Sequence, residues 1–193
     1  MTSTPAPGRR SARERLLEAA DRLFYNEGIH TVGIDRVLDE AGVAKGSLYY
    51  NFGGKDDLVR TYLQNRHAKW AARIDERIEA AGTPGEQVLA VFDALGELFT
   101  EPGFRGCAFI NAGAEAPPGS AEDLAAKDFR TWLHGLFEAL VSDAGYSNPG
   151  LISTQLVLLY DGSNIAAAMD GNQQAAQAAR TAADMLLQAA PHS

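Results

Sequence analysis

Side chains suited to contacts with nucleic acid gather near residue 50 of this 193-residue chain, in the segment KGSLYYNFGGK. Lys45 and Lys55 carry the positive charge that holds phosphate groups. Between them, Tyr49, Tyr50 and Asn51 carry hydrogen-bonding groups that meet phosphates or the edges of bases. The segment therefore has the residue types of a DNA-reading surface.

Two short helices joined by a sharp turn are predicted to present these side chains. Leu48 and Phe52 mark the buried stripe of the second helix, and since the two neighbouring tyrosines cannot both share that stripe, at least one is exposed. Gly42 allows the turn between the helices, as in a helix-turn-helix. The first helix has apolar residues at helical spacing: Ile34, Val37, Leu38 and Ala41.

A third helix, preceding this pair, is predicted to pack over it. Ser11 and Glu14 form a capping box that starts the helix, and Gly28 ends it. Its apolar face consists of Leu16, Ala20, Leu23 and Phe24.

The segment that follows this apolar helix resembles the DNA-binding domain of the TetR/AcrR family of transcriptional regulators. Its ordered pattern is T-V-x-x-x-x-V-x-x-x-A-G-V-x-K-G-x-L-Y-Y-x-F-x-x-K. The resemblance covers about residues 11 to 60. The chain departs from the family at Gly33, where a Ser or Thr usually caps the second helix, and at Leu38, where Ala is usual.

The resemblance implies a set of DNA-contacting residues. Ser47 and Tyr50, with Ala44 against a thymine methyl, would read bases. Tyr49, Asn51 and Lys55 would hold phosphates, and Arg36 would reach the DNA backbone. The whole implied set is Arg36, Ala44, Lys45, Gly46, Ser47, Tyr49, Tyr50, Asn51 and Lys55.

The charge distribution is compatible with a DNA partner, although the net charge is −8. Residues 1–60 hold nine Lys and Arg against nine Asp and Glu, so the acidic excess lies in residues 61–193, with eight basic and sixteen acidic residues. We interpret Arg9, Arg10, Arg13 and Arg15 as a local basic cluster that binds phosphate; the alternative is a solvated charge run.

The composition of the whole chain argues against several other classes of protein: membrane-spanning, secreted, disulfide-bonded and metal-binding. No run approaches the roughly 18 apolar residues of a membrane span, and no signal peptide opens the chain, so we expect a cytoplasmic protein without a membrane partner. A single cysteine excludes an internal disulfide framework. No cluster of His and Cys has metal-ligand spacing, and we expect neither a metal nor a cofactor.

An all-α fold of about nine helices is predicted, because no segment shows the alternation of a strand. Residues 1–10 are expected to be a flexible basic arm, 11–54 the helix-turn-helix domain, and 55–193 a helical domain for ligand binding and dimerisation. This last domain would begin with a rod of roughly 26 residues, near 40 Å long. Further helices are expected at about 85–99, 103–116, 120–144, 149–171 and 173–190, with Leu124 among the inward residues of the helix over 120–144.

The middle of the chain is, by the family resemblance, an inducer-binding domain. It has more aromatic surface than a small helical core needs, and apolar walls with a few polar groups such as Asn111 and Glu115 describe a small-molecule pocket. Each aromatic residue also has the simpler interpretation of plain core. The candidate ligand-binding residues are Trp70, Phe92, Phe99, Phe104, Cys107, Phe109, Asn111, Phe129, Trp132 and Phe137.

Cys107 lies in a Gly-Cys-apolar segment similar to one in some TetR-type repressors that sense electrophiles or oxidants. Arg105 is near in sequence and would favour the thiolate. The alternative is an inert, buried cysteine. An enzymatic pair of Cys107 with a histidine is a rival hypothesis, but no oxyanion loop, phosphate-binding glycine run or paired-carboxylate motif supports it, so we predict no enzyme. The histidines in question are His30, His67 and His134.

A dimer is expected, because one short recognition helix gives poor specificity and helix-turn-helix proteins bind paired half-sites. The last two helices are the candidate interface: residues 151–169 are apolar beyond one stripe, and small residues in the final helix allow close approach of a partner. The alternative is that these helices cap the monomer's core. The small residues are Ala175, Ala176, Ala178, Ala179, Ala182 and Ala183.

Taken together, these features predict a sequence-specific transcriptional regulator, and most simply a repressor that a small apolar or reactive ligand releases from a palindromic operator. The alternatives are an activator and a DNA-binding or interaction protein that responds to no ligand.

Overall fold

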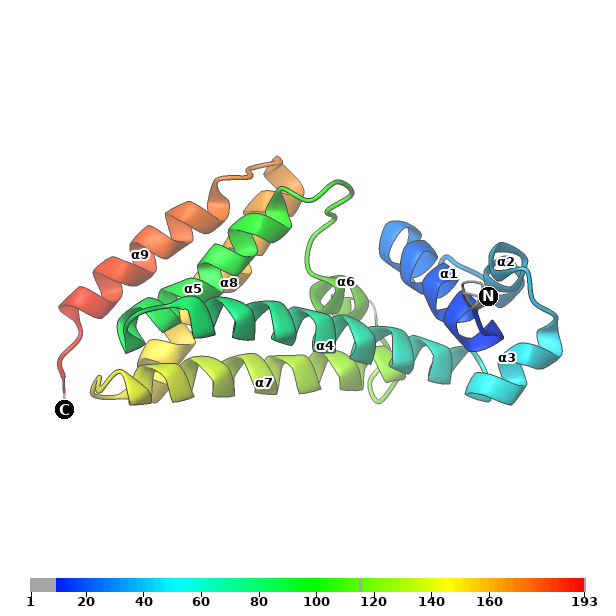
Figure 1. The fold of residues 1–193 in the computed structure, drawn as a ribbon, viewed down its shortest axis with the longest axis horizontal. Helices are drawn as coiled ribbons and strands as arrows, with labels where there is room; N and C mark the ends of the chain where they lie inside the picture. Colours follow the sequence, from blue (N-terminus) through cyan, green and yellow to red (C-terminus); the bar gives the residue numbers. More distant parts are fainter. Residues whose placement is uncertain (1–9, 115, 193) are drawn as a thin grey trace, which may run out of the picture.

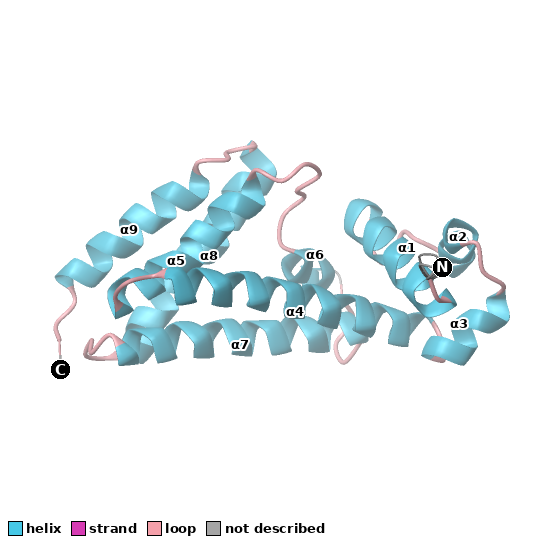
Figure 2. Cartoon of the chain, in the orientation of Figure 1, coloured by secondary structure: helices cyan, strands magenta, loops and turns pink. Residues whose placement is uncertain are grey.

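The computed structural model describes residues 10–114 and 116–192, and within them the chain is helical apart from turns, loops and an isolated bridge between Tyr146 and His192. The all-α prediction is confirmed (Figure 2). Most of the expected basic arm, with Arg9, and the predicted polar anchor Glu115 lie outside the described residues. The helices are α1 Ala12–Glu27, α2 Ile34–Ala41, α3 Lys45–Phe52, α4 Lys55–Ala80, α5 Pro84–Phe99, α6 Ala108–Ala114, α7 Ala121–Asp143, α8 Pro149–Asp170 and α9 Ala175–Ala189.

The first three helices form a head at one end of the molecule, and α4 connects it to the rest (Figure 1). Helix α4 has 26 residues, as predicted, and runs beside α7 towards the far end, where α5, α8 and α9 gather. We call α4–α9 the body. Helix α6 lies between the two ends of the molecule (Figure 1). At about 1.5 Å per residue, α4 is near 40 Å long and is the helix that leads from the head into the body.

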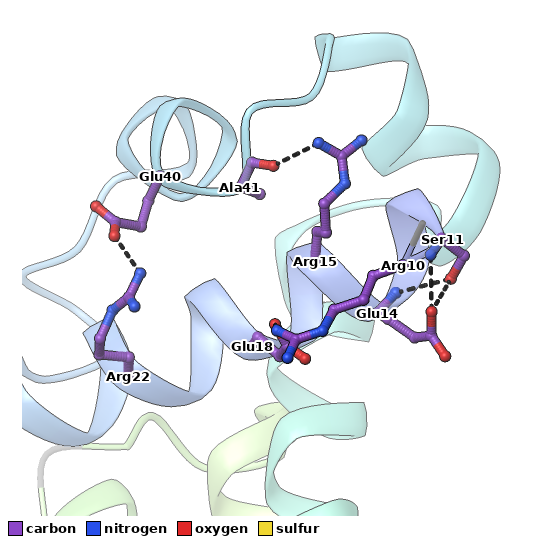
Figure 3. A network of polar contacts seen from close by, with 8 residues as sticks. All are labelled: Arg10, Ser11, Glu14, Arg15, Glu18, Arg22, Glu40 and Ala41. Carbon is purple, nitrogen blue, oxygen red and sulfur yellow. Dashed lines mark hydrogen bonds and ion pairs between the residues drawn. The ribbon is translucent and has the colours of Figure 1, made fainter. Parts of the chain in front are cut away.

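The head begins at the predicted capping box. The Ser11 backbone N–H donates to the Glu14 carboxylate over 2.7 Å, and the Glu14 N–H donates to the Ser11 hydroxyl over 3.2 Å (Figure 3). The Ser11 backbone N–H and the Ser11 hydroxyl, which both donate to the Glu14 carboxylate, lower the pKa of that group. The bend between α2 and α3 is made by Gly42, whose φ of 61° lies in the left-handed region that favours glycine. Local chemistry thus decides where each of these helices starts and turns.

Two of the four arginines in the predicted basic cluster, Arg10 and Arg15, contact groups of their own chain. Arg15 turns inward and donates to the carbonyls of Ala41 and Gly42, over 3.1 and 3.0 Å (Figure 3). Those carbonyls end α2, where a positive charge is favoured by the helix dipole. Arg10 is paired with Glu18 (Figure 3). Arg15 is therefore used inside the head, whereas Arg10, which precedes α1, forms an exposed ion pair.

Two further expectations about the body need correction. Of the described residues in the predicted helix over 103–116, only Ala108–Ala114 are helical, because Gly103 and Gly106 have φ values of 82° and 89° and hold the segment before α6 in a loop. Leu124, expected to point inward, is 49% exposed on α7.

Within the described residues, no helix combines the length and the apolar character needed to cross a membrane.

Candidate DNA-reading surface and ligand cleft

Helix α3 exposes both of its tyrosines. Tyr49 is 55% exposed and Tyr50 is 90% exposed, whereas Leu48 and Phe52 on the opposite side are buried in the head. The prediction required only one exposed tyrosine, and the structure exposes both. An aromatic side chain that contacts so little of its own protein is available to a partner.

The rest of the predicted DNA-contacting set surrounds these tyrosines. Ala44, the N-cap residue of α3, is exposed, as are Lys45 and Gly46 at its start. Ser47 and Asn51 are half-buried, and the Asn51 side-chain amide donates to the Ser47 carbonyl over 2.7 Å. The exposed N-terminal turn and the outward tyrosines therefore form one continuous surface.

Two basic members of the predicted set contact other groups of their own chain. The Lys55 ammonium group donates to the carbonyls of Ile29 and Val32 over 2.7 and 2.8 Å, which leaves one of its three N–H donors for a phosphate. The Arg36 guanidinium is paired with the Glu27 carboxylate. Lys45 and Arg36 are both exposed, but the contact of Lys45 with Asp35 is longer, at 3.6 Å.

A cleft lies between the head and the body. Its volume is about 220 Å³, and its wall combines residues of α1 with residues of α4, α6, α7 and α8 and of the end of α5. Phe109 and Phe129 stack in parallel on its apolar side, with ring centroids 4.0 Å apart. Its lining consists of Asp21, Tyr25, Arg66, Lys69, Trp70, Arg73, Leu98, Glu101, Gly106, Cys107, Ala108, Phe109, Phe129, Tyr160 and Asn164.

Tyr25 holds the head against the loop that leads into α6. Its hydroxyl donates to the Gly106 carbonyl and accepts from the Arg105 N–H, both over 2.9 Å. The Arg105 guanidinium also donates to the Asn26 carbonyl. Burial raises the pKa of Tyr25, so the hydroxyl keeps its proton at neutral pH. We call these contacts the Tyr25 latch.

Arg66 joins the same junction from α4. It donates to both carboxylate oxygens of Asp21, over 2.8 and 3.1 Å, and its guanidinium lies 3.8 Å from the centre of the Tyr25 ring. A bidentate pair that also stacks on an aromatic ring fixes the orientation of α4 relative to α1.

Comparison with known proteins shows which family has this architecture. Residues 16–62 match the family model described as bacterial regulatory proteins, tetR family. The crystal structure of SCO4454, a TetR-family transcriptional regulator from Streptomyces coelicolor, is 34% identical, with a TM-score of 0.86 over 92% of this chain and 94% of that one. The chain belongs to the TetR family of transcriptional regulators. It is therefore a helix-turn-helix protein that regulates transcription by binding DNA.

Curated TetR-family relatives match less than half of the chain. The HTH-type transcriptional regulator LmrA of Bacillus subtilis is 34% identical over 90 residues, which are 46% of this chain and 48% of LmrA. The HTH-type transcriptional repressor KstR2 of Mycolicibacterium smegmatis is 29% identical over 84 residues, 44% of this chain and 41% of KstR2. The chain thus spans about half or less of the length of these curated relatives. Since they are regulators and not enzymes, the enzymatic hypothesis for Cys107 is set aside.

The structure separates the ten predicted ligand-binding residues into two groups. Four line the cleft: Trp70, Cys107, Phe109 and Phe129. The other six do not line it: Phe92, Phe99 and Phe137 are buried in the core, Phe104 packs on Phe99, Trp132 packs on His67, and Asn111 donates to the Arg105 carbonyl. Helical periodicity identifies a side chain that faces inward, but not whether it meets another side chain or a cavity.

Sequence analysis missed most of the polar part of the cleft. Arg66, Lys69 and Arg73 look like an ordinary charged helix face. Tyr160 and Asn164 lie on α8, which was assigned to dimerisation. Asn164 carried a usable signal, because a polar residue buried within an apolar helix is uncommon and needs a partner; it donates to the Tyr160 carbonyl over 3.1 Å.

The thiol of Cys107 faces the cleft in a neutral state. Burial raises its pKa, and Arg105, expected to favour the thiolate, instead bonds to the Asn26 carbonyl. A thiol with a raised pKa has less of the reactive thiolate at neutral pH. The structure thus removes the physical reason given for a redox-sensing role.

The alanines of α9 do not form the expected partner surface. Ala175, Ala176, Ala179 and Ala183 are buried within the chain, where α9 packs on α5 and α8, and only Ala178 of the six is exposed. The exposed apolar surface lies instead mainly on α8, at Leu151, Leu158, Ile165 and Met169, with Met185 on α9. We call these five residues the α8 stripe.

Proposed function

We propose that this TetR-family protein is a repressor that binds a palindromic operator as a homodimer and releases it when a small molecule occupies the cleft. The observation that carries this proposal is the composition of the cleft wall, which combines Asp21 and Tyr25 of the head with side chains of the body. A ligand held there touches both parts at once. We further propose that residues 11–54 read DNA and that residues 55–193 bind the ligand and dimerise.

The exposed surface of α3 supports the DNA-reading part of the proposal. We assign base contacts to Ala44, Ser47 and Tyr50, and phosphate contacts to Lys45, Tyr49 and Asn51, because side chains at the start and outer face of a recognition helix reach the major groove. Gly46 lets the backbone of α3 come close to the DNA. Arg36 and the free donor of Lys55 lie at the margins of this surface and contribute less.

The α8 stripe supports a homodimer. Leu151, Leu158 and Ile165 repeat every seven residues, which puts them on one side of α8, and Leu158 is 66% exposed. A self-complementary apolar face of this kind fits a second copy of the chain related by two-fold symmetry. Two heads held by such a dimer would meet half-sites about 34–36 Å apart.

The Tyr25 latch supplies the proposed coupling. Gly106 lines the cleft and also accepts the Tyr25 hydrogen bond, so a ligand that shifts Gly106 acts directly on the head. A ligand changes the balance between two head positions only by binding one of them better. Release of the operator therefore requires that the ligand-bound dimer hold its two heads at a distance that differs from the spacing of the operator half-sites.

The DNA-reading proposal is tested by selecting duplexes from a random pool with the full-length protein and titrating the selected site. We expect an inverted repeat with a steep salt dependence. Tyr50→Ala should lower its affinity at least about tenfold, or about 1.4 kcal/mol, because a base contact is lost. The control is Leu124→Ala, which removes an exposed side chain on α7, outside the head. Equal binding by Tyr50→Ala and wild type would refute the assignment of Tyr50.

The homodimer is tested by light scattering of two matched variants. Leu158→Glu places a charge within the α8 stripe and should give a monomer, whereas Leu124→Glu alters an exposed leucine outside it and should leave the dimer intact. A dimeric Leu158→Glu variant would place the interface elsewhere.

A further inference from the structure

We infer that the cleft binds a small amphiphilic anion, with its apolar body among Trp70, Phe109 and Phe129 and a carboxylate or similar acceptor group at Lys69. This inference deepens the proposed ligand-responsive function and rests on it. It specifies a chemical class that neither the DNA-reading surface nor family membership determines.

The cationic side of the cleft has one uncompensated charge. Arg66 is paired with Asp21, and Arg73 is paired with Glu101. Lys69, which lies between these two arginines on α4, has no carboxylate within 4 Å in the part of the chain that the structure describes. The lining therefore holds three cations and two carboxylates, and both carboxylates are already engaged. A ligand anion at Lys69 would complete the third pair.

A buried donor on the apolar side favours an acceptor as well. The indole N–H of Trp70 is buried without an acceptor in hydrogen-bond geometry, although the Tyr160 hydroxyl interacts with it. Trp70 and Lys69 are adjacent in sequence and both line the cleft. Because an indole nitrogen only donates, the group that satisfies it must carry a lone pair. A carboxylate has two oxygens, and so can accept from a lysine and from an indole.

An organic cation fits the same cleft less well. Aromatic rings attract cations, but the Tyr25 ring is already covered by the Arg66 guanidinium at 3.8 Å. The carboxylates of Asp21 and Glu101 are held by arginines and would have to exchange partners. A second positive charge beside Lys69 would also be repelled.

The size of the cleft limits the apolar body of the ligand. A volume of about 220 Å³ is below the roughly 300–1,000 Å³ of pockets that hold drug-sized molecules. The parallel rings of Phe109 and Phe129 offer a flat stack against which a planar or short-chain group can lie. One or two rings, or a short acyl chain, match this space.

The inference is tested by calorimetry of the full-length protein with matched acids and amides: phenylacetate and phenylacetamide, 2-naphthoate and 2-naphthamide, octanoate and octanamide. We expect at least one carboxylate to bind at least tenfold more tightly than its amide. Lys69→Gln should remove that preference, whereas Lys127→Gln, at an exposed lysine on α7 outside the cleft, should retain it. Trp70→Phe keeps an apolar ring but removes the N–H, and should weaken the carboxylate several-fold.

Three results would overturn the inference: no binding by any acid, equal binding of acids and amides, or tighter binding of the cation 2-naphthylmethylammonium. Operator binding by the ligand-free protein is measured separately on the selected duplex. If the operator is bound and the acids fail, the ligand class falls while the DNA-reading function stands. If an acid binds through Lys69 and no operator is selected, the proposed ligand class stands and the DNA-reading function falls.

Discussion

Aromatic residues serve opposite purposes in α3 and in the body. Tyr50 on α3 is 90% exposed and touches little of its own chain, whereas Phe92 and Phe137, from α5 and α7, are fully buried with ring centroids 5.8 Å apart. Buried rings stabilise a helical body by removing apolar surface from water. An exposed ring adds nothing comparable to the folded chain, so its contribution must come from a partner. The contrast separates residues that hold the protein together from residues that we propose contact DNA.

The largest expected effect contrasts the two kinds of aromatic residue directly. Phe137→Ala should lower the free energy of unfolding by about 3–5 kcal/mol, because it leaves a cavity in a core that cannot collapse fully. Tyr50→Ala should change that free energy by less than about 0.5 kcal/mol. Denaturant titration of both variants measures the difference. A strongly destabilised Tyr50→Ala variant would mean that α3 packs against the chain in solution, and the contrast would fail.

Substitution of two lysines, Lys45 of the head and Lys55 at the start of α4, should have an intermediate effect. These variants again compare a residue that stabilises the fold with one that we propose contacts DNA. Lys55→Met removes a charged donor from the Ile29 and Val32 carbonyls and should lower the free energy of unfolding by about 1.5–3 kcal/mol. Lys45→Met should leave stability unchanged but reduce the salt dependence of operator binding by about one ion. Melting curves and affinities at several salt concentrations distinguish the two. If Lys55→Met were fully stable and lost the salt dependence instead, Lys55 would be a phosphate contact first.

The smallest effect concerns the thiol of the cleft. Because burial raises the pKa of Cys107, the thiolate fraction at pH 8 is lower than in a free thiol and increases only as the pH rises towards the raised pKa. Alkylation by iodoacetamide should be at least about fivefold slower than at a Ser142→Cys site, exposed on α7, placed in a Cys107→Ser background. Equal rates at pH 8 would revive the thiol-sensing hypothesis.

The head was predictable because its signals are local. A capping box, a glycine turn and an apolar stripe each depend on residues within a few positions, and these features of Ser11, Gly42 and Leu48 all recur in the structure. The pairing of Arg15 and Lys55 with backbone carbonyls was not predictable, because each of these contacts spans 23 residues or more of the chain. Charge alone does not reveal whether a basic side chain faces DNA or its own backbone.

The ligand site was harder to predict for a related reason. Trp70 and Phe137 both follow the helical period and both point inward, yet one lines the cleft and the other is closed in by neighbouring helices. The same limit applies to α9, where small residues such as Ala176 pack within the chain, so that most of the exposed apolar side chains of these two helices lie on α8. Small size allows close approach but does not say which helix approaches.

By itself the sequence determined the helical class, the DNA-reading head and the family, because periodicity and capping act over one or two turns of helix. Only the tertiary structure decided which charges are free. It placed Asp21 and Tyr25 of the head in one cleft with Lys69 and Trp70 of the body, and it left Lys69 as the cation there without a partner in the described part of the chain. The physical reason is that a binding site depends on which groups remain unsatisfied after packing, and packing joins residues that are far apart in the sequence.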